Sequence, residues 1–200
     1  RRLELGYCRV IGNHALDGGT VQGGQGRVFN NRFEDNIAYA GGALNGFEGD
    51  IEDNLFQANS ASYGGALYRC EGPISNNRIV DNETAVHGTV FESRGEFKGN
   101  TVQGNRAKRG GGLYRHAGAI ESNTFSDNNG SEGGALYQCH DPVRDNELVG
   151  NTARSGGAVA ECNGRIEDNR IVDNVAEVNG GAFYSCRGEI VGNRIEGNRA

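Results

Sequence analysis

A repeat of 23 residues fills almost the whole chain and limits its possible folds more than any other feature. Each repeat opens with a short glycine-rich motif, as in Gly64-Gly65-Ala66-Leu67, and contains two asparagines five residues apart. The spacing is 23 residues six times and 24 once, with the extra residue in the segment 175–179. The repeats begin at Gly18, Gly41, Gly64, His87, Gly110, Gly133, Gly156 and Gly180.

Two asparagine columns run through every repeat. The first column contains Asn31, Asn54, Asn77, Asn100, Asn123, Asn146, Asn169 and Asn193. The second column contains Asn36, Asn59, Asn82, Asn105, Asn128, Asn151, Asn174 and Asn198. An asparagine amide that is buried without partners costs about 1–3 kcal/mol. We therefore expect continuous ladders, in which each amide bonds the asparagines of the neighbouring repeats and the backbone of the turns.

Short alternating apolar runs, broken by glycine and asparagine at fixed places, are typical of short strands joined by tight turns. No apolar pattern with a helical period is present. The repeat therefore predicts an all-β, right-handed parallel β-helix of about 8.5 coils, with neighbouring coils about 4.8 Å apart. We expect one domain over residues 1–200: a partial coil 1–17, full coils from 18, 41, 64, 87, 110, 133 and 156, and a last coil 180–200.

Two motifs carry a family resemblance. GGA followed by an apolar residue occurs at 41–44, 64–67, 133–136, 156–159 and 180–183, and F-x-x-N occurs at 33–36, 56–59 and 125–128. Together they resemble the repeats of the polymorphic outer-membrane proteins and related right-handed β-helix surface proteins. The resemblance covers nearly the whole chain and implies an exported passenger or adhesin at the cell surface or outside the cell. Right-handed β-helices also include pectin- and alginate-degrading enzymes.

Composition narrows the possible partners and cofactors. The net charge of -6, without a basic stripe, argues against nucleic acid as a partner. No apolar stretch approaches the roughly 18 residues of a transmembrane segment. The five cysteines show no C-x-x-C spacing, and His14, His87, His116 and His140 form no pair at metal-ligand spacing. We expect no catalytic residue, metal or cofactor.

One acidic column occurs in alternate coils. Its members are Asp35, Asp81, Asp127 and Asp173, with glycine or alanine at the same place in the coils between them. The strand spacing puts these carboxylates roughly 9–10 Å apart. We interpret the intervening small residues as a relief of repulsion along a surface column.

Strict alternation from the inward alanine of the GGA motif predicts that two columns face the core. The first contains Cys70, Cys139, Cys162 and Cys186. The second contains Tyr68, Phe91, Tyr114, Tyr137 and Tyr184. We expect free thiols, because stacked Cβ atoms about 4.8 Å apart are too distant for an easy disulfide. We expect the rings to stack in the core, whereas an outward column of rings would form a sugar-binding strip.

The same alternation turns an apolar column outward. It contains Val21, Leu44, Leu67, Val90, Leu113, Leu136, Val159 and Phe183. Such a stripe exceeds the apolar patch that a monomer usually exposes, so either a local bend buries it or it forms a lateral contact face. In the next outward column Arg69, Glu92 and Arg115 alternate in charge, which favours stacking of the coils in this register.

The chain begins and stops within a coil, without a cap at either end. Exposed strand edges pair readily, so we expect the partner to be another copy of the chain or a neighbouring part of a longer one. These features favour a non-enzymatic extracellular structural or adhesive module, able to assemble end to end into a filament. The alternative is a polysaccharide-binding or polysaccharide-degrading β-helix, with surface glycans as partners.

Overall fold

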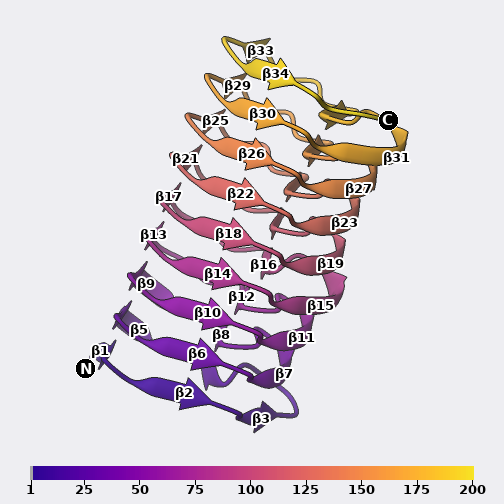
Figure 1. Ribbon diagram of the computed structural model, residues 1–200. Coiled ribbons are helices and arrows are strands. Elements are labelled where there is room, and N and C mark those ends of the chain that lie inside the picture. Colours follow the sequence, from indigo (N-terminus) through magenta and orange to yellow (C-terminus); the bar gives the residue numbers. More distant parts are fainter. Residues whose placement is uncertain (1) are drawn as a thin grey trace.

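The computed structural model describes residues 2–200, which form a parallel β-solenoid without a helix. Each coil contributes one strand to each of four sheets, and each strand pairs in parallel with the strand four places later in the chain (Figure 1). The predicted all-β solenoid with coils about 23 residues apart is confirmed. Its right-handedness stays a prediction.

The four sheets extend along the stack of coils. The first sheet contains β1 Leu3–Gly6, β5 Gln25–Phe29, β9 Glu48–Glu52, β13 Ile74–Ser75, β17 Phe97–Lys98, β21 Ile120–Glu121, β25 Val143–Arg144, β29 Ile166–Glu167 and β33 Ile190–Val191. The second contains β2 Arg9–Ile11, β6 Arg32–Glu34, β10 Leu55–Gln57, β14 Arg78–Val80, β18 Thr101–Gln103, β22 Thr124–Ser126, β26 Glu147–Val149, β30 Arg170–Val172 and β34 Arg194–Glu196.

The third and fourth sheets are separated by the glycine-rich motif. The third contains β3 His14–Ala15, β7 Ile37–Ala40, β11 Ser60–Tyr63, β15 Glu83–His87, β19 Arg106–Arg109, β23 Asn129–Glu132, β27 Thr152–Ser155 and β31 Val175–Asn179. The fourth contains β4 Val21–Gln22, β8 Leu44–Asn45, β12 Leu67–Tyr68, β16 Val90–Phe91, β20 Leu113–Tyr114, β24 Leu136–Tyr137, β28 Val159–Ala160 and β32 Phe183–Tyr184.

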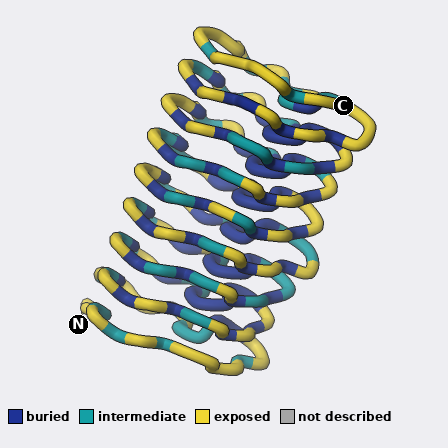
Figure 2. The backbone as a smooth tube through the Cα atoms, in the orientation of Figure 1, coloured by how far each residue is buried: buried dark blue, intermediate teal, exposed yellow. Residues whose placement is uncertain are grey.

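The core is one continuous cluster of apolar side chains inside the coils. Buried positions recur at the same places along successive coils (Figure 2). Residues at the same place in successive repeats are direct strand partners, as Phe33, Phe56 and Ile79 show. All three side chains are fully buried, and the rings of Phe33 and Phe56 stack with centroids 5.1 Å apart. The repeat thus stacks similar side chains directly on one another, so that each coil covers the core of the coil before it.

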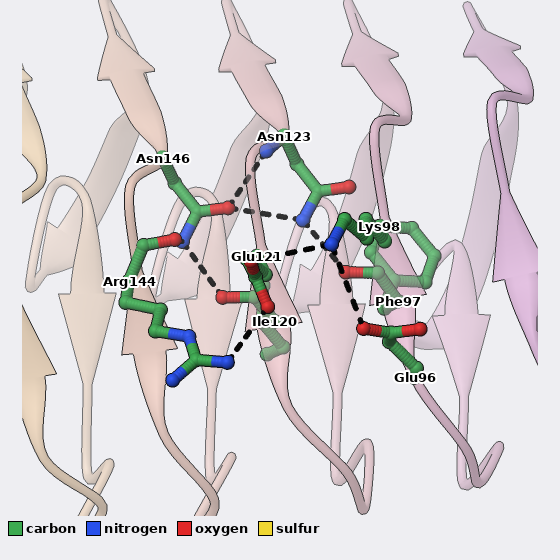
Figure 3. A network of polar contacts seen from close by, with 8 residues as sticks. All are labelled: Glu96, Phe97, Lys98, Ile120, Glu121, Asn123, Arg144 and Asn146. Atoms are coloured by element: carbon green, nitrogen blue, oxygen red, sulfur yellow. Dashed lines mark hydrogen bonds and ion pairs between the residues drawn. The ribbon is translucent and has the colours of Figure 1, made fainter.

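The asparagine ladders are present as predicted, and the coil pair in Figure 3 shows their pattern. The backbone N–H of Asn123 and its Nδ2 both donate to Oδ1 of Asn146, each at 2.9 Å. Nδ2 of Asn146 donates to the carbonyl oxygens of Ile120 and Arg144, at 2.9 and 2.8 Å. One side chain therefore pairs backbone groups of two coils at a turn where the strands leave them unpaired.

The turn before each ladder requires a left-handed backbone. The residue preceding Asn36 is Asp35, with φ of 55°, and the same place is taken by Ala58 at 52° and Gly104 at 64°. Aspartate, asparagine and glycine adopt this conformation more easily than other residues do. This demand accounts for the alternating acidic column better than relief of charge repulsion, because every member of the column, charged or not, has positive φ.

A bend in the GGA motif overturns the predicted outward apolar stripe. The backbone N–H groups of Ala66 and Leu67 donate to one carbonyl oxygen, that of Thr89, at 3.0 and 3.2 Å, so two consecutive residues face the same partner. Both side chains consequently point inward. Leu44, Leu67, Val90, Leu113, Leu136 and Val159 are fully buried, and Val21 and Phe183 pack against the same core. Of the two alternatives for this column, burial by a local bend is confirmed, and a lateral contact face is not formed.

The fourth repeat departs from the others near His87. Strand β15 pairs His87 with Tyr63, one residue out of step with the repeat, and Gly88 takes the left-handed conformation that Gly64 has in the coil before. The loop after Gly88 is one residue shorter, and register is restored where Val90 pairs with Leu67. His87 therefore ends the third-sheet strand, and Gly88 serves as the first glycine of this repeat.

We expect Asn100→Ala to lower the free energy of unfolding by about 3 kcal/mol or more, because several buried polar groups lose their partners. These are the backbone N–H and Nδ2 of Asn77 and the carbonyl of Ile74. Urea unfolding followed by circular dichroism measures the change. Asn198→Ala is the control: it lies in the last coil, where water can replace its bonds, and should cost about 1 kcal/mol or less. Equal losses would contradict the ladder account.

Candidate functional site

The aromatic column lies on the outside of the bend, not inside the solenoid as alternation predicts. Because Leu67 turns inward, the next residue, Tyr68, turns outward at the seam between the third and fourth sheets. Tyr68, Phe91, Tyr114, Tyr137 and Tyr184 form a second apolar cluster there, separate from the main core, together with Tyr63 and Ala160. We call this cluster the aromatic seam.

Stacking between neighbouring rings makes most of the aromatic seam inaccessible to solvent. Ring centroids of Phe91 and Tyr114 are 5.0 Å apart with nearly parallel planes, and those of Tyr114 and Tyr137 are also 5.0 Å apart. Phe91, Tyr114 and Tyr137 are only 5%, 2% and 4% exposed. Their faces are covered by neighbouring rings, so these three cannot serve as a sugar-binding strip. The predicted stacking and burial of these rings are confirmed, but they form a cluster of their own and do not pack in the main core.

Arginines cover the aromatic seam from the side. The guanidinium carbons of Arg69 and Arg115 lie 4.9 and 5.1 Å from the ring centroids of Tyr68 and Tyr114. Between them Glu92 accepts from Arg69 at 3.0 Å and pairs with Arg115 at 3.6 Å. The predicted alternation of charge is confirmed. Burial raises the pKa of the Tyr137 hydroxyl, and a hydrogen bond to Glu132 adds to the effect.

The cysteine column lies at the turn that leads from a strand of the fourth sheet to the next strand of the first sheet. Cys70, Cys139 and Cys162 are fully buried as predicted, and no cysteine forms a disulfide. The column repeats the geometry of the asparagine ladders with weaker partners. The backbone N–H of Cys139 lies 3.3 Å from Sγ of Cys162, which in turn lies 3.5 Å from the carbonyl oxygen of Ala160. Burial raises the pKa of the Cys70 thiol to about 12, which keeps it protonated at neutral pH.

His116 occupies the cysteine column in the fifth repeat. Its Nε2 donates to the carbonyl oxygen of Gly95 at 2.9 Å, its ring packs against Phe97, and its Nδ1 has no partner. Burial lowers the pKa of this imidazole from 6.5 to about 4, although Gly95 and the nearby Asp141 act in the opposite direction. The ring is therefore neutral at pH 7 and is part of the core.

This neutral histidine makes stability depend on pH. The unfolded chain takes up the proton below about 6.5 and the folded chain only near 4, so the stabilisation is complete above the unfolded pKa and is lost as the pH falls through this window. The shift corresponds to roughly 3 kcal/mol.

We expect the free energy of unfolding to drop by that order between pH 6.5 and 4, and the drop to shrink markedly in His116→Ser. Serine is the residue that the preceding repeat carries at this place, Ser93. Denaturant unfolding at a series of pH values measures the slope. An unchanged slope in the variant would contradict a buried neutral His116.

Ion pairs cross the coils on the outer face of the first sheet (Figure 3). Glu121 lies between two cations, 3.3 Å from Nζ of Lys98 and 2.9 Å from a guanidinium nitrogen of Arg144. These hydrogen bonds, the one from Arg144 foremost, lower the pKa of the Glu121 carboxyl. Exposed pairs of this kind contribute little stability individually. Their regular occurrence keeps outward charges paired from one coil to the next.

A shallow depression on the outer face of the third sheet is a feature that the sequence columns did not single out. It has a volume of about 440 Å³ and is lined by Asn129, Ser131, Thr152 and Arg154 among others. The signal that could have found it is a column in which cations two repeats apart, Lys108 and Arg154, have no acidic residue between them.

Within residues 2–200 no cluster of three or more histidine, cysteine or acidic side chains could hold a metal ion. The described part of the chain also has no helix with the length and hydropathy needed to cross a membrane. Comparisons with protein-family models, with curated proteins and with solved structures gave no match.

Proposed function

We propose that this chain is a non-enzymatic structural or adhesive module of the cell surface or extracellular space. The observation that carries the proposal is the unbroken ladder structure, in which the buried asparagines bind the next coil. The buried His116 likewise serves the core. The resemblance of the repeats to polymorphic outer-membrane proteins and adhesins supports the location and a right-handed coil. A stack of this kind serves reach and display.

The module can extend by adding coils, from a neighbouring part of a longer chain or from another copy. Ile190 and Ile195 belong to columns that are buried in the preceding coils, yet here they are 39% and 47% exposed. Beside them, Asn193 and Asn198 are the last asparagines of the two ladders in the described residues, and their Nδ2 groups bond the carbonyl oxygens of Ile166 and Ile171 in the coil before. Apolar columns and strand edges that match from copy to copy favour end-to-end stacking into a filament.

We expect residues 1–200 to associate with rising concentration, which light scattering and electron microscopy measure. Ile195→Lys should suppress association, because it places a charge in the core column at the end of the stack. Ile37→Lys is the matched control: Ile37 is also 47% exposed but lies on the side of the solenoid, in β7. A monodisperse monomer at high concentration, or equal effects of both substitutions, would contradict filament assembly.

Polysaccharide binding is a second candidate, which the polar depression on the third sheet favours. An enzymatic form of this candidate has its own assay, the absorbance of unsaturated uronate products after incubation with acidic polysaccharides. We expect no turnover. Turnover that survives purification would replace the non-enzymatic proposal by a lyase.

A further inference from the structure

The depression on the third sheet results from short side chains between long ones. Strand β23 pairs with β27 so that Asn129 lies beside Thr152 and Gly130 beside Ala153. The same register places Ser131 between Lys108 of the preceding coil and Arg154 of the following one. Ser131 and Arg154 line the depression together with Gly130 and Ala153, and Lys108 lies next to it in β19.

The two cations beside this gap are exposed and unpaired. No carboxylate of residues 2–200 lies within 4.0 Å of the charged groups of Lys108 or Arg154, whereas Arg109, on the same sheet, pairs with Glu132 at 3.3 Å. Glu177 lines the depression on the far side of Arg154 from Ser131, and Glu83 lies outside it, beside Arg106. The centre of the depression therefore favours an anionic group, although the chain as a whole carries a charge of -6.

Neutral hydrogen-bonding groups complete the surface. Nδ2 of Asn129 donates to Oγ1 of Thr152 at 2.7 Å, which leaves the threonine hydroxyl proton and one amide proton free for a ligand. The hydroxyl of Ser131 lies on the same side of the sheet. Val175, at the rim, offers a small apolar contact. Such a surface suits a ligand rich in hydroxyl groups that also carries a carboxylate.

We propose that the depression binds an acidic polysaccharide, with one carboxylate held between Lys108 and Arg154 over Ser131. Arginine can bind a carboxylate through two parallel hydrogen bonds, and lysine adds a point charge. The amide and hydroxyl groups of Asn129 and Thr152 bind the sugar hydroxyls. The carboxylate of Glu177, which lines the depression, accepts from hydroxyl groups and repels a nucleic acid, whose phosphates are more densely spaced.

The site deepens the adhesive side of the proposed function and rests on it, but it does not depend on filament assembly. Binding is therefore measured in the Ile195→Lys chain, so that loss of assembly and loss of binding are separate results. The probe is a fluorescently labelled oligogalacturonate followed by polarisation at increasing salt. The same oligosaccharide with methyl-esterified carboxylates serves as the neutral ligand, and single-stranded DNA as the competing polyanion.

We expect the oligogalacturonate to bind with an affinity that falls with salt, and the methyl ester to bind at least about tenfold more weakly. Lys108→Gln with Arg154→Gln should weaken binding by about tenfold or more, since both partners of the carboxylate are lost. Arg78→Gln is the matched control, an exposed arginine of the second sheet that is also without a carboxylate within 4.0 Å. Circular dichroism verifies that each variant folds.

Three results would overturn the site: no binding of oligogalacturonate, equal binding of its methyl ester, or equal losses in the double variant and in Arg78→Gln. Tighter binding of DNA than of the oligosaccharide would likewise replace the glycan by a nucleic acid.

Discussion

The rest of the structure depends on hydrogen bonds between stacked asparagine side chains. Each coil must turn sharply between its sheets, and the turn leaves a backbone N–H facing inward, where water cannot reach it. Oδ1 of Asn100, for example, accepts the backbone N–H of Asn77, and its Nδ2 donates to the carbonyl oxygen of Ile74 in the same preceding coil. The amide of asparagine offers both functions at the required reach, and a ladder satisfies all of its members only when it is unbroken.

The turn from the fourth sheet to the first sheet has the same backbone geometry as the two asparagine turns, with different side chains. It has a left-handed residue, such as Arg69 or Glu161, followed by an inward residue that is a cysteine in four of the repeats. A thiol donates and accepts weakly, so this corner contributes less to stacking and instead fills the core. The looser demand explains why His116 and Ser93 fit the same column.

The sequence predicts the solenoid well because its columns report on contacts between neighbouring coils. The 23-residue period, the asparagine ladders and the buried cysteines all follow from stacking like on like. Whether a side chain points into the core or outward is predicted less well, because strict alternation assumes an uninterrupted strand. The bend between Ala66 and Leu67 reverses the next two residues, which moves Leu67 into the core and Tyr68 out to the seam, and the predicted inward position returns at Cys70. Only an explicit bulge in the glycine motif could have placed these two columns.

The depression on the third sheet was missed in the sequence for a different reason. It arises because Ser131 is shorter than the residues at the same place in the neighbouring coils, not because one residue type recurs in every repeat. In the proposed glycan site, departures from the repeat supply the binding surface, while the repeat itself carries the fold.

Hydrogen exchange at the ladder asparagines tests the central claim most directly. Nuclear magnetic resonance can follow both the backbone N–H and the side-chain amide of each asparagine. In the central coils the amides of Asn100 and Asn105 should exchange slowly, at rates close to those of global unfolding, while the side-chain amide of the exposed Asn163 exchanges quickly. Fast exchange of the ladder side chains in a folded chain would contradict the account, because it would mean that the coils are held together by the apolar core alone.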